Sequence, residues 1–237
     1  MHFWQALPVR FLLPRGCRQE RFKRMSQSDD ATKGVRISRT TAEGSVSADD
    51  VLAVEEPLEI RLAYRDDKGL PLTRGISITM RMPGDDTALA AGFLATEGIL
   101  SSPEDLEEIT IGSGEDSSGL GLSPNIARVA LRIGKKVDLE QLSRHVFTSS
   151  SCGVCGKATL EALASRGLGR IEGDDLRMTS DSLRALPEKL LKGQATFAAT
   201  GGLHATALVD GEGQVTDLAE DIGRHNAVDK ILGWRLL

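Results

Sequence analysis

The most informative segment of this chain reads Glu220-Asp221-Ile222-Gly223-Arg224-His225-Asn226-Ala227-Val228-Asp229-Lys230. It joins a predicted strand at 215–219 to a predicted final helix, in which Ala227, Ile231 and Trp234 lie on one side. Before it, residues 203–209 form another predicted strand, and the glycines and acids of 210–213 supply the turn between the two. Helices and strands therefore alternate in the second half of the chain, which favours an α/β core.

The first half of the chain is predicted to be mainly sheet. Alternating apolar residues predict strands at 51–54, 57–64, 74–82, 109–111 and 128–133. One helix is predicted at 88–97, where Pro83-Gly84-Asp85-Asp86 supplies an aspartate cap and Gly98 a stop. Residues 26–45 are polar and are predicted to be mobile. A helical region around 183–191 is predicted to be interrupted at Pro187.

The composition is that of a globular protein with one large domain or two smaller ones. The 237 residues are 40% hydrophobic and 27% charged, and no apolar run approaches the roughly 20 residues that span a bilayer. Aromatic residues make up only 4%, which argues against a surface that stacks nucleic-acid bases. The formal net charge of -5 likewise argues against a protein that coats nucleic acid. We therefore predict neither a nucleic-acid partner nor a membrane partner.

Two of the three cysteines lie close together, in Ser151-Cys152-Gly153-Val154-Cys155-Gly156-Lys157. The glycines free the backbone, and a predicted helix follows at once, so its first amides and Lys157 favour a thiolate. A thiolate is the form that attacks sulfur, and the segment therefore suits persulfide or disulfide chemistry. Three cysteines do not make a disulfide framework, so a reducing cytosol is the expected setting.

Other interpretations of the cysteine pair remain open. A zinc site needs four ligands in a structural centre or three plus water in a catalytic one, and the sequence has no second Cys-x-x-Cys. His145, His204 or His225 would have to complete such a site, and we predict no bound metal. A thiol–disulfide oxidoreductase is another interpretation, although the usual preceding βαβ pattern is missing. Two buried, inert cysteines are disfavoured by the surrounding serines and glycines.

Two further polar groups are candidates for binding an anion. His204 follows Thr200-Gly201-Gly202, and the glycine pair lets a ligand approach the backbone, although a histidine in a strand also suits a purely structural role. The polar helix start carries Arg224, His225, Asn226 and Lys230, where Arg224 and the helix amides suit a phosphate. Helix capping and a solvated charged face are the structural alternative for this cluster.

The two ends of the sequence lead to one expectation each, about the start of translation and about truncation. Residues 1–24 hold six basic residues against one acid and lack the apolar centre of a secretory signal. We expect translation to start at Met25, which would make Cys17 incidental. At the other end, Trp234-Arg235-Leu236-Leu237 stops inside a predicted helix, and we expect the sequence to be truncated there.

Together these motifs resemble the formate dehydrogenase accessory sulfurtransferases, the FdhD family. The resemblance rests on residues 151–157, on Thr200-Gly201-Gly202-Leu203-His204-Ala205 and on residues 220–230. Residues 83–86 and 92–98 fit the first half of the same family. The resemblance covers about residue 35 to the end, and the run at 220–230 is its most specific part.

The resemblance implies a cytoplasmic sulfurtransferase that carries sulfur as a cysteine persulfide. It would accept sulfane sulfur from a cysteine desulfurase and pass it to the molybdenum cofactor, as bis-molybdopterin guanine dinucleotide, before insertion into formate dehydrogenase. We expect Cys152 to be the carrier, with Cys155 as a helper or second carrier. No permanently bound cofactor is expected, and a homodimer is compatible with the resemblance. The residues expected to contact the cofactor are His204, Arg224, His225, Asn226 and Lys230, with Arg224 and Lys230 facing phosphate.

The resemblance also implies a domain organisation. It gives an N-terminal extension at 1–34, a small N-terminal α+β subdomain at 35–140 and a cytidine-deaminase-like α/β domain at 141–237. The zinc signature of the deaminases, His-x-Glu with Pro-Cys-x-x-Cys, does not occur in the sequence, so base deamination is not implied. Members of the family continue past the final helix with residues that contact the cofactor, and the second domain is therefore expected to be incomplete.

Overall fold

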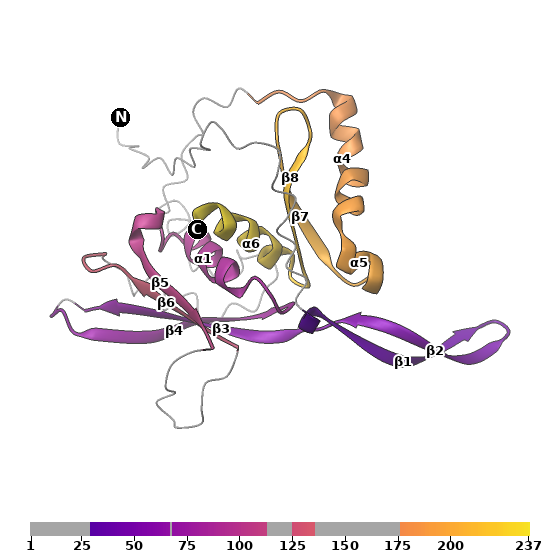
Figure 1. Ribbon diagram of the computed structural model, residues 1–237, viewed down its shortest axis with the longest axis horizontal. Coiled ribbons are helices and arrows are strands. Elements are labelled where there is room, and N and C mark those ends of the chain that lie inside the picture. Colours follow the sequence, from indigo (N-terminus) through magenta and orange to yellow (C-terminus); the bar gives the residue numbers. More distant parts are fainter. Residues whose placement is uncertain (1–28, 67, 113–124, 136–175) are drawn as a thin grey trace, which may run out of the picture.

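The computed structural model describes residues 29–66, 68–112, 125–135 and 176–237 (Figure 1). Cys152, Cys155 and His145 lie outside the described residues. The described residues form a mixed α/β fold, as the sequence predicts.

A four-stranded sheet forms the centre of the first half. Its strands are β3 (Glu56–Arg65), β4 (Pro71–Arg81), β5 (Leu106–Ile111) and β6 (Ile126–Leu131), in the order β4-β3-β6-β5. Strand β3 runs parallel to β6, whereas the β3–β4 and β5–β6 pairs are antiparallel. A short 3-10 turn, η2 (Pro103–Asp105), leads into β5. The strand predictions at 57–64 and 74–82 are confirmed. In β3 the alternation marks the buried face, with Leu58, Ile60 and Leu62 inside, whereas in β4 Ile76 is buried but Ile78 is 70% exposed.

Helices α1 (Asp86–Thr96) and α6 (Arg224–Leu236) pack side by side on one face of this sheet (Figure 1). The core between them and the sheet contains Leu58, Ile60 and Leu62 of β3, Leu94 of α1 and Leu236 of α6. The last helix of the chain therefore completes the core that the first half begins. No helix among the described residues is both long enough and apolar enough to cross a membrane.

Two glycines set the distance between α1 and α6. A Cβ atom on Gly92 would lie 1.8 Å from the backbone oxygen of Asp229, and one on Gly233 would lie 1.8 Å from that of Ala88. Each glycine therefore faces the backbone of the opposite helix, where no larger residue fits. The side chains of α6 are thereby held in a fixed position relative to α1 and the sheet.

The start of α1 differs from the prediction. Asp85 occupies the N-cap in a left-handed conformation, with φ 58°, and its side chain makes no capping hydrogen bond, so the predicted aspartate cap is wrong. The next carboxylate, that of Asp86, instead forms a bidentate ion pair with the buried Arg81. The Nε and Nη2 atoms of Arg81 each lie 2.9 Å from an oxygen of Asp86. Charge pairing with a buried guanidinium outcompetes capping here. The predicted stop at Gly98, with φ 75°, is confirmed.

The second half is built around a hairpin of β7 (His204–Val209) and β8 (Val215–Asp221). Helix α6 contacts both strands, and α4 (Ser180–Gly193) lies along the hairpin, followed by the short α5 (Ala195–Thr200). Helix α4 continues through Pro187, so the predicted interruption is wrong. Proline removes one amide donor, and the carbonyl that loses it belongs to the exposed Leu183, where water can replace the bond.

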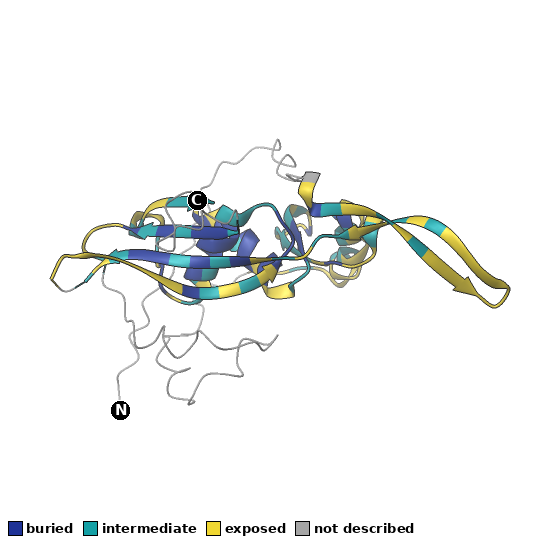
Figure 2. Cartoon of the chain, turned by 90° about the horizontal axis from the view of Figure 1, so that it is seen from below, coloured by how far each residue is buried: buried dark blue, intermediate teal, exposed yellow. Residues whose placement is uncertain are grey.

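The region 26–45 contains a strand, and the prediction that it is mobile is wrong for residues 32–45. After η1 (Asp29–Ala31), β1 (Thr32–Thr41) and β2 (Gly44–Ala53) pair as a long antiparallel hairpin, which we call the β1–β2 arm. The arm extends away from the rest of the fold and is exposed along most of its length (Figures 1 and 2). At its base, the amide of Val54 donates to the carbonyl of Ala31 at 2.9 Å.

Candidate functional site

Asp221 is the centre of a buried hydrogen-bond network where β8 meets α6. Its Oδ1 accepts from the amide of Gly223 and from Asn226 Nδ2, each at 2.9 Å. Its Oδ2 accepts from Lys230 Nζ at 2.7 Å and from the amide of Met82 at 3.3 Å. The side chain is 0% exposed. Four donors therefore offset the loss of hydration of this carboxylate.

Lys230 is buried beside it, with a side chain only 1% exposed. Besides Asp221, its Nζ donates to the carbonyl oxygens of Met82 at 3.2 Å and Glu220 at 3.4 Å. An ammonium group has three hydrogens, and all three are used. The Asp221–Lys230 contact is thus a buried ion pair in which both groups have a full set of partners.

Asn226 extends the network to the end of β4. Its Nδ2 donates to the carbonyl of Met80 at 2.7 Å as well as to Asp221, and its Oδ1 accepts from Thr79 Oγ1 at 2.9 Å. Thr79 and Met80 lie 147 and 146 residues away in the sequence. The first turn of α6 is therefore fixed to a strand from the other half of the chain.

This anchoring turns Arg224 and His225 outward. Asn226, Ala227 and Lys230 are buried on the inner side of α6, whereas Arg224 and His225 are exposed in its first turn. Gly223 lets the turn close, because a Cβ at that position would lie 2.7 Å from Asn226 Nδ2. The first amides of a helix have no acceptors within the helix, and they attract anions. A guanidinium and an imidazole thus stand beside amides that suit a negatively charged group.

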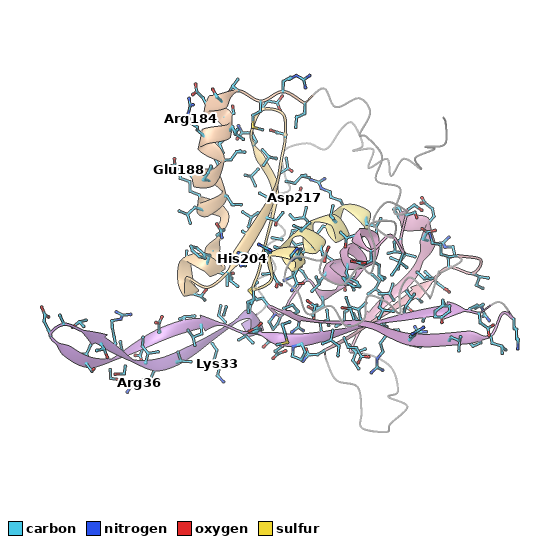
Figure 3. The ribbon with its side chains drawn as sticks, turned by 180° about the vertical axis from the view of Figure 1, so that it is seen from behind. Lys33, Arg36, Arg184, Glu188, His204 and Asp217 are labelled. Atoms are coloured by element: carbon cyan, nitrogen blue, oxygen red, sulfur yellow. The ribbon has the colours of Figure 1, made fainter. Side chains whose placement is uncertain are left out.

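Strand pairing brings His204 to the same place. In the β7–β8 register His204 lies opposite Asp221, which is two residues before the N-cap of α6. His204 is exposed, and Figure 3 shows it at the α5 end of the hairpin near the start of α6. The motifs at 200–205 and 220–230, which are separate in the sequence, are therefore neighbours in the fold.

Glu220 fixes the turn that precedes His204. Its carboxylate accepts from the amides of Thr196 at 3.0 Å and Phe197 at 2.7 Å, which open helix α5. Helix α5 ends at Gly201, whose φ of 70° is left-handed, and the chain then enters β7. Glu220 and Asp221 are adjacent at the end of β8. The first is bonded to α5, which precedes His204, and the second is bonded to α6, which carries Arg224.

Asp229 faces α1 and differs from the other buried carboxylates. Burial raises the pKa of Asp229 to about 7; the hydrogen bond from Thr96 opposes this shift, and the negative charges of Glu97 and Asp221 add to it. Thr96 Oγ1 lies 3.0 Å from Asp229 Oδ1 and 2.9 Å from the carbonyl oxygen of Phe93. A hydroxyl has one proton for these two acceptors. A protonated Asp229 resolves the conflict by donating to Thr96, which then donates to Phe93.

The five residues predicted to contact a cofactor divide into two groups. His204, Arg224 and His225 are exposed and lie around the start of α6. Asn226 and Lys230 are buried, and their polar hydrogens are directed at protein acceptors, so Lys230 does not offer its ammonium to a phosphate in this structure. The solvated charged face considered for this cluster is also wrong for Asn226, Asp229 and Lys230.

Sequence reasoning missed the part of this network that comes from the end of β4 and from Met82, the residue that follows it. Thr79, Met80 and Met82 contribute a hydroxyl, two carbonyls and an amide, and backbone groups leave no mark in the sequence. One signal was available: Asn226 and Lys230 are four residues apart, on the side of the helix that also carries Ala227 and Ile231. In the described ranges, no three His, Cys, Asp or Glu side chains are grouped as metal ligands would be.

Comparison with known proteins shows the family to which this chain is related. A sequence profile of the FdhD/NarQ family matches residues 53–237. The chain is 41% identical over 206 residues to the "Sulfur carrier protein FdhD" of Mycobacterium tuberculosis, covering 86% of this chain and 71% of that protein. It is 43% identical over 214 residues to the protein of the same name from Streptomyces coelicolor, covering 90% and 71%.

A third relative is the "Sulfur carrier protein FdhD" of Thermoplasma acidophilum, 41% identical over 201 residues, covering 85% of this chain and 66% of that protein. Among solved structures, the fold is similar to that of a protein from Desulfotalea psychrophila assigned as a formate dehydrogenase accessory protein. The TM-score is 0.58 with 22% identity, and the match covers 87% of this chain and 69% of that one. At this identity the likeness supports the mixed α/β fold alone.

Proposed function

Because the chain belongs to the FdhD/NarQ family, we propose that it is a sulfur carrier in the maturation of formate dehydrogenase. The family match over residues 53–237 carries this proposal. The Cys152–Cys155 motif supplies the thiols for such a role, and the exposed groups at the start of α6 supply an anion-binding surface. The proposed setting is the cytoplasm, where a cysteine desulfurase donates the sulfur and formate dehydrogenase receives the product.

Loading is a thiol exchange. The thiolate of Cys152 attacks the terminal sulfane sulfur of the desulfurase persulfide. A new S–S bond forms at Cys152 while the S–S bond on the desulfurase breaks, and the desulfurase cysteine leaves as a thiolate. The carrier then holds a persulfide and no electrons are gained or lost overall. Lys157 and the first amides of the helix predicted after the motif favour the thiolate that this step requires.

Release requires two electrons, because sulfane sulfur must leave as sulfide. Cys155 can supply them in the helper role. Its thiol attacks the Cys152 sulfur of the persulfide, hydrogen sulfide anion is expelled, and a Cys152–Cys155 disulfide forms. The sulfide goes to the acceptor, bis-molybdopterin guanine dinucleotide, and a cellular dithiol then reduces the disulfide. The acceptor is a substrate in this scheme.

The acceptor is proposed to bind by its phosphates at the start of α6. Arg224 and the helix amides would hold a phosphate, and His204 and His225 would contact the same ligand from the other side of the turn. Asn226 and Lys230 would act as positioning residues, since their contacts with Asp221 and β4 fix the turn that carries Arg224.

Sulfur loading tests the role of the cysteines. After incubation with a cysteine desulfurase and cysteine labelled with radioactive sulfur, we expect the wild type to carry the label. Its mass should increase by about one sulfur atom. Cys152→Ala should lose the label, whereas Cys155→Ala should load but fail to release it, because the resolving thiol is gone. In protein expressed from Met1, Cys17→Ala is the matched control and should behave as the wild type. Equal labelling of wild type and Cys152→Ala would overturn the assignment.

Nucleotide binding tests the other half of the site. In a calorimetric titration with GDP, Arg224→Ala should bind about 10–100-fold more weakly, because a charge-assisted hydrogen bond to phosphate is lost. Arg184→Ala is the matched control, since Arg184 is exposed on α4 and should leave binding unchanged. An Arg224→Ala titration that superimposes on the wild type would count against this placement of the acceptor.

A further inference from the structure

Asp229 carries a buried carboxyl group that the proposed sulfur transfer does not use. It lies in the second turn of α6, on the side that faces α1, and is only 7% exposed. A Cβ atom on Gly92 would lie 1.8 Å from the backbone oxygen of Asp229, so the two helices touch at this residue. This close contact holds the carboxyl group of Asp229 between the helices, where water does not replace missing hydrogen bonds.

The partners of Asp229 suit a neutral carboxyl group better than a carboxylate. Asp221 accepts from four donors, whereas Asp229 has one among the described residues, the hydroxyl of Thr96 at 3.0 Å. That hydroxyl also lies 2.9 Å from the carbonyl oxygen of Phe93, which can take its single hydrogen. Lys230, the next residue along α6, directs its ammonium hydrogens to Asp221 and to two carbonyl oxygens. The adjacent cation therefore does not serve Asp229.

The acidic neighbours of Asp229 also favour its neutral form. Burial is the largest influence and raises the pKa of Asp229 to about 7, and the negative charges of Glu97 on α1 and Asp221 at the end of β8 add to the shift. On α6 itself, Lys230 is paired with Asp221. His225, one turn before Asp229, favours the ionised form only when its own ring is protonated. Asp229 therefore gains and loses its proton near neutral pH.

Ionisation of Asp229 places a negative charge close to the proposed phosphate site. Arg224 begins α6, and the rise from it to Asp229 is about 7.5 Å, at about 1.5 Å per residue. The positive end of the helix dipole attracts an anion there, and a carboxylate in the second turn opposes that attraction. Unit charges about 10 Å apart, at an effective dielectric constant of about 20, change a binding constant on the order of tenfold, and salt reduces this effect.

We propose that Asp229 is a proton switch for the anion site at the start of α6. With Asp229 protonated the site binds a phosphate group tightly, and with Asp229 ionised it binds the same group more weakly. By linkage, a bound phosphate raises the affinity of Asp229 for its proton by the same factor. The inference rests on the phosphate site proposed above. Asp229 does not touch the ligand in this scheme, and it acts through its charge alone.

Calorimetric titration of the full chain with GDP, from about pH 5.5 to about pH 8.5, tests the switch. The dissociation constant of the wild type is divided by that of Asp229→Asn, which cancels the titration of the phosphate and of the histidines that both proteins share. This ratio should be near one at about pH 5.5 and rise to about three- to tenfold at about pH 8.5. Asp181→Asn, at an exposed position in α4, is the matched control, and its ratio should not change with pH.

Thr96→Val tests whether the proton on Asp229 is responsible. Valine keeps the shape of threonine but removes the hydroxyl that stabilises the ionised carboxylate. In this background, the ratio with and without Asp229→Asn should therefore rise at a higher pH than in the wild type, and an unchanged or lower midpoint would contradict the proposal. Binding of GDP with a ratio that stays constant overturns the switch and leaves the anion site standing. No binding of GDP by the wild type or by Asp229→Asn at any pH overturns both.

Discussion

Replacing Lys230 with methionine is expected to lower the free energy of unfolding by about 3–5 kcal/mol. Methionine fills much of the same volume but leaves Asp221 without its cation, in a site where that carboxylate is 0% exposed. The carbonyls of Met82 and Glu220 also lose a donor. An uncompensated buried charge costs far more than an ordinary surface contact. Urea unfolding at pH 7, followed by circular dichroism, measures the change.

Two comparisons show whether the loss comes from the buried pair. Lys192→Met removes a lysine whose partner is Glu188, and their side chains are 73% and 72% exposed, so the free energy of unfolding should change little. Lys230→Met combined with Asp221→Asn should recover part of the stability, because no charge is then left unpaired. A Lys230→Met variant as stable as Lys192→Met would show that the network does not hold α6 in place.

The stability of the wild type is expected to fall as the pH rises from about 4 to about 7, and Asp229→Asn should remove this fall. The folded-state pKa of Asp229, about 7, lies above its ordinary value of 3.8, so the folded protein binds the extra proton between these values. Stability then declines with pH until the folded-state carboxyl has ionised. A difference of about three units corresponds to on the order of 4 kcal/mol.

The substitution separates Asp229 from the other titrating groups. Asparagine Nδ2 can donate to Thr96 as the protonated carboxyl does, so the variant should match the wild type near pH 4 and be more stable above pH 7. Urea midpoints at pH 5, 6, 7 and 8 give the comparison. Asp181→Asn, at an exposed position in α4, is the control and should leave the pH dependence as in the wild type. Wild-type and Asp229→Asn curves that run parallel would contradict a buried neutral carboxyl.

The spacing of apolar residues was enough to predict the elements of the central sheet and the helix that follows it. The strand at 57–64 buries one face, so its apolar residues recur at intervals of two. The helix at 88–97 is apolar and buried at consecutive positions from Ala88 to Gly92, because it lies between the sheet and α6. The β1–β2 arm escaped prediction because its polar face dominates the composition of residues 32–45. A hairpin forms there through cross-strand contacts, and these pair residues such as Ile37 and Ala48, which no periodicity within one strand reveals.

The chemistry proposed for this protein rests on residues that the sequence alone identifies: a Cys-x-x-Cys with glycines, an Arg-His-Asn helix start, and His204. The roles of the polar residues at 220–230 depend on the tertiary structure. Arg224 and Asn226 are two residues apart in one polar run, yet one is exposed and the other is held by Met80, 146 residues away. Residue type sets what a side chain can bind. Burial and partners, which only long-range packing supplies, decide whether it faces a ligand or supports the helix.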